Sequence, residues 1–318
     1  MVKDRLSDDA EHSLAIRAAW LHYVGGLRQA EVAKRIGVTS LKAHRLIARA
    51  VSEGAVKVSI EGEIVECLEL EAAMTARFGL EVCEIAPDLG EDGVPFRTLA
   101  LAGAAFLRRW SVSSDALTIG IGHGRTLAEA VRAMPGFKTN KISFVSLLGG
   151  LTRNFAANPH DVMHLLAEKT GARAYVLPVP FFANSAEDRE VLLAQRGVKE
   201  VFGIAENAEL KFVGIGTVGD DTQLVNSGMI EPAEIEEISR AGGVAEMLGH
   251  FFDSDGVALE TPLISRTLAV SLYEGRQDRI FALAGGPEKE APLRAILKSG
   301  RLSGLITDER TARALLAE

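Results

Sequence analysis

The chain has 318 residues, of which 47% are hydrophobic and 25% are charged. This balance is typical of a folded protein, and the length allows one small and one large domain, each with its own core. No apolar run approaches the roughly 18 residues that a membrane-spanning helix needs, and the first residues are charged, unlike a secretory signal. The two cysteines, Cys67 and Cys83, form no CxxC motif. Composition therefore argues against a membrane protein and a disulfide framework, and favours a cytoplasmic protein.

Charge is unevenly distributed along the chain. The net charge is −8, yet residues 1–60 carry ten Lys and Arg against six Asp and Glu, whereas residues 61–318 carry 25 against 37. A positive module joined to an acidic body suits a polyanionic partner at one end only. A solvated helix surface would give the same local excess, so charge alone leaves both interpretations open.

The first 60 residues are predicted to form three helices and a short strand. A second helix over residues 28–36 ends at Gly37, and Thr39 can cap a third helix that runs to about Glu53. The alternation of residues 55–60 then predicts a small strand, or wing. The first helix, residues 12–24, has an apolar stripe that consists of Leu14, Ile16, Ala19, Trp20 and Tyr23.

The spacing within residues 29–47 is typical of a helix-turn-helix. Ala33 is small where two helices must approach closely, and Gly37, four positions later, can adopt the left-handed conformation of the turn. In such a motif the second helix enters the major groove of DNA with its first turns. A three-helix module with a purely structural or dimerising role is the alternative.

Polar side chains of this module divide into two groups by expected contact. Some of Ser40, Lys42 and His44, which follow the Thr39 cap, are expected to read base edges. Arginines suit phosphate contacts, which add affinity but carry no sequence information. The predicted DNA-binding residues are therefore Arg28, Thr39, Ser40, Lys42, His44, Arg45 and Arg49.

The remainder of the chain alternates short apolar runs with helical segments. A helix over residues 68–78 ends at Gly79. Apolar strands that alternate with helices indicate a parallel, doubly wound, Rossmann-like α/β sheet. We therefore predict a winged helix-turn-helix domain over residues 1–60 and an α/β domain over residues 61–318. The candidate strands are residues 81–86, 116–121, 142–147, 173–177, 212–215 and 280–283, with a last run near 305–306.

The loop after the second of these strands, residues 120–126, is a candidate ligand site. The N–H groups of Gly122 and Gly124 can approach a ligand, beside Arg125. Thr126 can both cap the following helix and donate to a ligand at the helix N-terminus. The glycines alternate and do not match the G-x-G-x-x-G pattern, so no dinucleotide cofactor is predicted. A glycine-rich structural turn is the alternative for this loop taken alone.

Three further glycine-rich loops follow other strands. Gly149 and Gly150 follow the strand at 142–147, Lys289 follows the strand at 280–283, and residues 214–217 form the third loop. Ligands of open α/β sheets bind at the carboxyl ends of the strands. Four such loops together predict a site there, with Lys289 as a fixed cation for a phosphate or a hydroxyl cluster.

Two other patterns carry less specific signals. Asp253, in the run Phe-Phe-Asp-Ser-Asp-Gly at 251–256, can orient sugar hydroxyls, although Asp-x-Asp-Gly is also ordinary turn chemistry. His160 and His164 have the i, i+4 spacing of metal ligands on a helix, but no third ligand is evident, so a surface or capping role is favoured. No metal site is predicted.

These residues resemble the SorC family of sugar-responsive bacterial transcriptional regulators over nearly the whole chain. The matching segments are Tyr23-Val-Gly-Gly-Leu, Gln29-Ala-Glu, His44-Arg-Leu-Ile, Gly122–Thr126, Leu147–Leu151, Phe251–Gly256, Ala284–Lys289 and Leu305-Ile-Thr-Asp-Glu309. The resemblance implies a sugar-binding domain akin to sugar-phosphate isomerases and deaminases, and an operator-binding dimer or tetramer. It also implies that the ligand contacts are Gly124, Arg125, Thr126, Gly149, Gly150 and Lys289, with Asp253 a weaker match.

Two departures from the family pattern concern the ligand. Leu148 stands where some members carry a basic residue, and His123 and Arg125 replace smaller or aromatic residues. Both leave the phosphorylation state of the ligand open. The overall similarity is greatest to members that act on polyol catabolism, such as erythritol regulators.

The sequence thus predicts a DNA-binding regulator of carbohydrate or polyol catabolism, not an enzyme. Its predicted partners are double-stranded operator DNA and a sugar, polyol or sugar-phosphate effector, with no membrane contact. One alternative is an isomerase- or deaminase-like enzyme that carries a DNA module, with His123 and Asp253 as acid/base candidates. The other is an architectural DNA-binding protein whose large domain binds no ligand.

Overall fold

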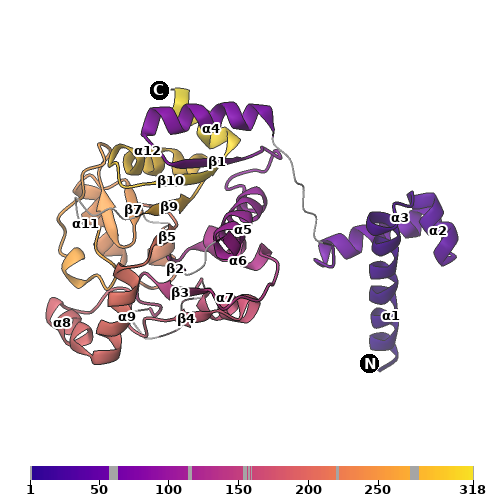
Figure 1. Ribbon diagram of the computed structural model, residues 1–318, viewed down its shortest axis with the longest axis horizontal. Helices are drawn as coiled ribbons and strands as arrows, with labels where there is room; N and C mark the ends of the chain where they lie inside the picture. The colour runs from indigo at the N-terminus through magenta and orange to yellow at the C-terminus, as the bar shows by residue number, and fades with distance from the viewer. Residues whose placement is uncertain are drawn as a thin grey trace. The chain divides into compact units, whose positions relative to one another are not determined.

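The computed structural model describes residues 2–56, 64–113, 117–152, 156, 158, 160–219, 222–272 and 279–317 (Figure 1). The chain divides into two compact units, Met1–Gly62 (unit 1) and Glu63–Glu318 (unit 2). Each unit has hydrophobic clusters of its own and is described by itself.

Unit 1 is helical. Helix α1 (Val2–Ala19) continues into a π-helical turn, η1 (Trp20–Val24), and is followed by α2 (Gln29–Ile36) and α3 (Ser40–Ser52). Gly37 ends α2 in the left-handed conformation, with φ of 70°. The Thr39 hydroxyl accepts the N–H of Lys42 at 3.3 Å and so caps α3. The second and third helices predicted from the sequence are confirmed, together with their end signals.

Small residues hold unit 1 together. Its core contains Ala15 and Ala18 of α1, which face Leu46 and Ile47 of α3. The predicted stripe on the first helix is partly wrong, because Ile16, Trp20 and Tyr23 are exposed, Trp20 to 65%. Alanines allow α1 to approach α3 more closely than these larger side chains would.

The predicted wing is not described as a strand. Residues 57–60 of this segment lie outside the described residues, and Ala55 and Val56 have no strand assignment.

Unit 2 is built on a seven-stranded parallel sheet of order β1-β10-β9-β5-β2-β3-β4. The chain adds β3 and β4 on one side of β2, and β5, β9 and β10 on the other. The order therefore reverses between β2 and β5, which is the switch point of a doubly wound sheet. The strands are β1 (Val82–Ala86), β2 (Leu117–Ile121), β3 (Ile142–Ser146), β4 (Arg173–Tyr175), β5 (Leu210–Val213), β9 (Ile280–Leu283) and β10 (Gly304–Asp308). The predicted parallel α/β fold is confirmed; β5 begins two residues earlier than predicted.

Helices cover both faces of the sheet. Alternate residues of one strand enter different cores: Phe212 packs under α5, α6 and α7, whereas Val213 packs on the opposite face, whose cover includes α4, α12 and α13 (Figure 1). The helices of unit 2 are α4 (Val65–Phe78), α5 (Phe96–Ser113), α6 (Arg125–Ala133), α7 (Met163–Thr170), α8 (Ala186–Ala194), α9 (Arg196–Glu206), α10 (Gln223–Asn226), α11 (Pro232–Arg240), α12 (Glu290–Lys298) and α13 (Glu309–Ala317).

A small antiparallel sheet, which the sequence did not predict, lies beside the main one. It consists of β6 (Gly216–Thr217), β7 (Ala245–Met247) and β8 (His250–Phe252). The hairpin between β7 and β8 turns at Leu248, which has a positive φ of 52°, and Gly249. Two single-turn 3₁₀ helices, η2 (Ile264–Arg266) and η3 (Pro287–Lys289), complete the elements. Within the described residues, no helix combines the length and the apolar character needed to cross a membrane.

Candidate DNA interface and effector site

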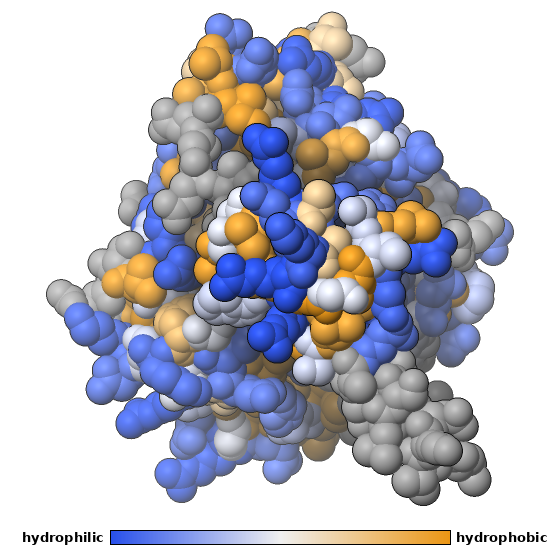
Figure 2. All heavy atoms as spheres, turned by 90° about the vertical axis from the view of Figure 1, so that its right-hand side faces the viewer, coloured by the Kyte–Doolittle hydropathy of each residue, from blue (hydrophilic) through white to orange (hydrophobic). Residues whose placement is uncertain are grey.

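Helix α3 separates its side chains into a buried and an exposed side. Ala43, Leu46, Ile47 and Ala50 are buried against the other helices of unit 1. Figure 2 shows one face of the molecule, on which hydrophilic side chains prevail with apolar ones between them. In unit 1, the exposed polar residues include those predicted to contact DNA: Arg28, Thr39, Ser40, Lys42, His44 and Arg45.

One residue on the exposed side of α3 was missed by the sequence reasoning. Leu41 is 63% exposed and lies one helical turn before Arg45. An exposed leucine on a DNA-reading helix can contact a thymine methyl group. An apolar residue type gives no signal of a DNA contact, and only the place of Leu41 in the helical periodicity could have indicated an exposed position.

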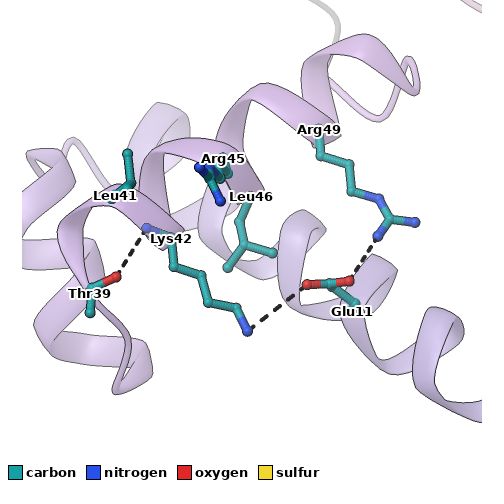
Figure 3. A pocket seen from close by; sticks show the side chains of 7 residues that line it. All are labelled: Glu11, Thr39, Leu41, Lys42, Arg45, Leu46 and Arg49. Atoms are coloured by element: carbon teal, nitrogen blue, oxygen red, sulfur yellow. Dashed lines mark hydrogen bonds and ion pairs between the residues drawn. The ribbon is translucent and has the colours of Figure 1, made fainter.

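A pocket of about 370 Å³ lies between α1 and α3 (Figure 3). Glu11 of α1 reaches into it, with a carboxylate oxygen 3.3 Å from the Arg49 guanidinium and the other 4.0 Å from the Lys42 ammonium. The pocket is lined by Glu11, Thr39, Leu41, Lys42, Arg45, Leu46 and Arg49.

Arg49 is more constrained than its sequence position indicated. Its Nε donates to Glu53 at 2.6 Å, and the same Glu53 carboxylate contacts the His12 ring at 2.7 Å. The hydrogen bond from Arg49, followed by that from His12, lowers the pKa of Glu53. The Arg49 side chain is thus held by Glu11 and Glu53, so a DNA phosphate would compete with these carboxylates for its guanidinium.

In unit 2 the loop after β2 lies at the switch point of the sheet. The Gly122 N–H donates to the Phe212 carbonyl of β5 at 2.8 Å, which joins the two strands beyond their ends. Gly124, with φ of 133°, is the N-cap residue of α6. The predicted cap at Thr126 is therefore wrong: because Gly124 adopts the cap conformation, the helix begins at Arg125 and Thr126 is its second residue. The first turn of α6, whose N–H groups have no acceptor within the helix, lies at this edge.

His123 sits between Gly122 and Gly124 and was not predicted as a ligand residue. Its ring packs edge-on against Phe181, and Nδ1 accepts a hydrogen bond from the Asn158 amide at 2.9 Å. Burial, followed by the nearby His160, lowers the pKa of His123 to about 4. The ring is therefore neutral near pH 7, and its Nε2 carries the proton as a donor. The signal available in the sequence was its departure from the family pattern.

Lys289 reaches the same edge from the loop after β9. Its ammonium lies 3.9 Å from the Glu288 carboxylate, which is also 3.7 Å from the Arg125 guanidinium of α6. Burial lowers the pKa of Lys289, and Glu288 partly opposes this effect. The structure thus brings together Arg125 and Lys289, which the sequence placed in separate loops.

Glu246 of β7 is a buried carboxyl group near Lys289, and sequence reasoning missed it. It is 7% exposed, and Oε1 accepts the Gly249 N–H at 2.7 Å. Burial raises the pKa of Glu246 to about 7, whereas the Gly249 hydrogen bond and the Lys289 charge lower it. A Cβ on Gly216 would lie 2.4 Å from Oε2, so a larger residue there would require the carboxylate to move. A carboxylate and an ammonium at one sheet edge can accept from and donate to the same polyhydroxy ligand.

Three residues predicted to contact the effector do not join this group. Gly149 and Gly150 donate their N–H groups to the carbonyls of Leu268 and Leu177. A Cβ on Gly149 would lie 2.1 Å from the Pro180 oxygen. These glycines therefore serve close packing of the backbone, and their N–H groups are already used.

Asp253 is the third such residue. Its Oδ1 accepts the N–H groups of Asp255 and Val257, both at 2.9 Å. The turn packs through Gly256 on Ser299, at the end of α12 opposite to Lys289. Glu246 lies within β7, where it pairs with Phe251, whereas Asp253 follows β8 beyond the open end of the hairpin. The ordinary turn chemistry that the sequence allowed is what the structure contains.

The histidine pair predicted to share a helix does not do so. Helix α7 begins at Met163, so His164 is helical and His160 precedes the helix. Over the described ranges, no group of three or more His, Cys, Asp or Glu side chains is placed to hold a metal ion.

A doubly wound sheet with charged side chains gathered at its switch point, joined in one chain to a basic helical unit, defines a ligand-responsive regulator. Residues 62–317 match the Sugar-bind family, a sugar-binding domain. The chain belongs to the SorC family of sugar-responsive transcriptional regulators, as the sequence resemblance predicted.

Known proteins are similar to the chain over nearly its full length. It is 62% identical over 310 residues to the erythritol catabolism regulatory protein EryD of Brucella abortus, with 98% of each chain covered. It is 32% identical to the transcriptional regulator LsrR of Klebsiella pneumoniae, over 97% of this chain and 94% of that one. The full-length sorbitol operon regulator SorC of Klebsiella pneumoniae has the same fold, with a TM-score of 0.72, 22% identity, and coverage of 96% and 98%. The chain is therefore a transcriptional regulator and not an enzyme.

Proposed function

We propose that this regulator controls polyol catabolism genes by binding operator DNA with α3 of unit 1 and a polyol, sugar or sugar phosphate at the switch point of unit 2. The observation that carries the proposal is the buried Glu246 beside Lys289 at the carboxyl ends of the strands. The similarity to an erythritol catabolism regulatory protein favours erythritol, or a phosphate formed from it, as the effector.

The chemistry of this edge suits a ligand with many hydroxyl groups. Each hydroxyl donates one hydrogen bond and accepts others. Glu246 accepts, whereas Lys289 and the Nε2 of His123 donate. Arg125 and the N-terminus of α6 offer a place for an anionic group such as a phosphate. The effector residues we propose are Gly122, His123, Gly124, Arg125, Thr126, Glu246 and Lys289.

For DNA we propose that α3 lies in the major groove. Ser40, Leu41 and His44 then reach base edges, while Arg28, Lys42, Arg45 and Arg49 contact phosphates. A single small module makes few contacts, so we propose that the regulator binds a two-fold operator as a homodimer or homotetramer. Residues Met1–Gly62 are the DNA-binding domain in this proposal, and Glu63–Glu318 the effector domain.

Operator affinity with and without effector tests the proposal. The protein is first footprinted on DNA upstream of its own gene, and the protected duplex is then titrated with erythritol or erythritol phosphate present. We expect one of these compounds to change the affinity of the wild type, and Lys289→Met and Glu246→Gln to remove that change while effector-free binding remains. Reciprocal linkage requires that DNA change the effector affinity by the same factor.

Lys298→Met is the matched control. Lys298 lies on α12 as an exposed residue paired with Asp255 at 3.2 Å, far from the switch point, and it carries the same charge as Lys289. Its variant should respond like the wild type. A full effector response in Lys289→Met would place the ligand elsewhere.

A further inference from the structure

Glu11 is an acidic side chain among the cations of the proposed DNA face. Its two carboxylate oxygens contact the side chains of Lys42 and Arg49, which reach it from α3 (Figure 3). The Glu11 side chain is itself 48% exposed, so the contact is open to solvent and to a competing anion.

A carboxylate in this position resembles a DNA phosphate in charge and in hydrogen-bond acceptors. A phosphate that binds Lys42 or Arg49 therefore competes with Glu11 for the same positively charged group. Exposed ion pairs of this kind are weak, so DNA can displace Glu11, but at a cost for each cation that is released.

This cost falls unequally on different DNA sequences. Binding to a non-specific sequence depends almost entirely on cations that neutralise phosphates. Binding to an operator also gains from base-edge contacts. Ser40 and His44 can make such contacts while Lys42 and Arg49 stay paired with Glu11. A carboxylate that withdraws cations from phosphate contact therefore weakens non-specific binding more than specific binding.

We propose that Glu11 is a specificity-determining residue, which competes with DNA phosphates for Lys42 and Arg49 and so penalises non-specific DNA. This inference rests on the proposed binding of DNA by α3. It assigns to α1 a role in recognition beyond its packing on α3.

The test compares Glu11→Gln with Glu236→Gln. Glu236 is an exposed residue of α11, paired with Arg240 at 2.9 Å, so its variant makes the same change in net charge away from unit 1. Each full-length protein is titrated with its footprinted duplex and with a shuffled duplex of equal length, from about 50 to 200 mM KCl. Glu11→Gln should bind the shuffled duplex about 10-fold more tightly at the lowest salt and gain less affinity for the footprinted duplex. The slope of log K against log salt concentration should become steeper by about one to two.

A double-mutant cycle identifies the cations. Lys42→Met should weaken binding to the shuffled duplex more in the Glu11→Gln protein than in the wild type, since only there is Lys42 free for phosphates. Equal effects in both backgrounds, or a Glu11→Gln protein that behaves like Glu236→Gln, would overturn the inference. A wild type that protects no duplex would instead refute the proposed function itself.

Discussion

The carboxylate of Asp308, at the end of β10, accepts the N–H of Gly286 at 2.9 Å and so ties this strand to the loop that carries Lys289. It also accepts the N–H and the hydroxyl of Thr311, at 3.0 and 2.6 Å, which fixes the start of α13. The Thr-Asp-Glu segment that contributed to the family resemblance therefore has a physical role. It holds the loop after β9 against the sheet edge without lying among the proposed ligand contacts.

Asp308→Ala should lower the free energy of unfolding by about 2 to 5 kcal/mol, because it leaves several buried donors without an acceptor. Asp308 is 3% exposed, so water cannot replace the carboxylate. Urea denaturation of the full chain measures the change. The control is Asp255→Ala, whose side chain is 79% exposed and which should shift stability by no more than about 0.5 kcal/mol. Similar losses in the two variants would contradict the role given to Asp308.

Glu246→Gln should stabilise the effector-free protein at pH 8 and have little effect on stability at pH 4.5. Burial raises the pKa of Glu246 from 4.5 to about 7, so the folded state holds a proton that the unfolded state releases. Stability of the wild type therefore falls as the pH rises from about 4.5 to 7 and is level above that. The penalty that ionised Glu246 places on stability at pH 8 is on the order of 3 kcal/mol, and glutamine, which keeps an acceptor for the Gly249 N–H, avoids it.

Thermal unfolding of both proteins from pH 4.5 to 8 measures this difference. Glu260→Gln, which alters an exposed carboxylate, is the control and should change stability equally at every pH. A Glu246→Gln difference that stays constant with pH would show that Glu246 has no raised pKa in the folded protein.

Gly149→Ala and Gly197→Ala should change stability in opposite directions. A Cβ at position 149 would overlap the Pro180 carbonyl at 2.1 Å, so the backbone must shift, and a loss of about 2 to 4 kcal/mol is expected. Gly197 lies in α9 with open space at its Cβ position, so alanine there should stabilise the helix by about 0.5 to 1 kcal/mol. Chemical denaturation compares the two. A neutral Gly149→Ala would mean that close packing does not require this glycine.

The main sheet could be predicted because its strands are short apolar runs buried on both faces, such as Ile280–Leu283. The C-cap of α2 and the N-cap of α3 were predictable for a similar reason, since Gly37 and Thr39 act through neighbouring backbone groups. Such local signals do not depend on where distant segments lie. They account for the second and third helices of unit 1 and for the strands of the parallel sheet in unit 2.

The site was less predictable because its partners meet only after folding. Glu246 lies in a three-residue strand and becomes a candidate site residue only because the fold brings it within the electrostatic influence of Lys289. Asp253, seven residues later, matched the expected chemistry but follows β8 beyond the open end of the hairpin. Trp20 illustrates the same difficulty in unit 1, where helical periodicity predicted burial and small alanines made the contact instead.

His44→Ala and Arg28→Ala should affect DNA binding in different ways. His44 is exposed near the start of α3 and, in the proposed complex, lies against base edges, so its loss should cost about 1 to 3 kcal/mol on the preferred sequence and little on others. Arg28 is the N-cap residue of α2, and its backbone N–H, which donates to Glu31 at 2.7 Å, survives the change to alanine. Its guanidinium is expected to contact a phosphate, so its loss should weaken binding to all sequences alike. The slope of log K against log salt concentration should fall by about one. Binding of both variants to a library of single-base changes in the footprinted duplex, at two salt concentrations, separates the two effects. If Arg28→Ala reordered the preferred bases and His44→Ala did not, then the N-terminus of α2, and not α3, would face the bases.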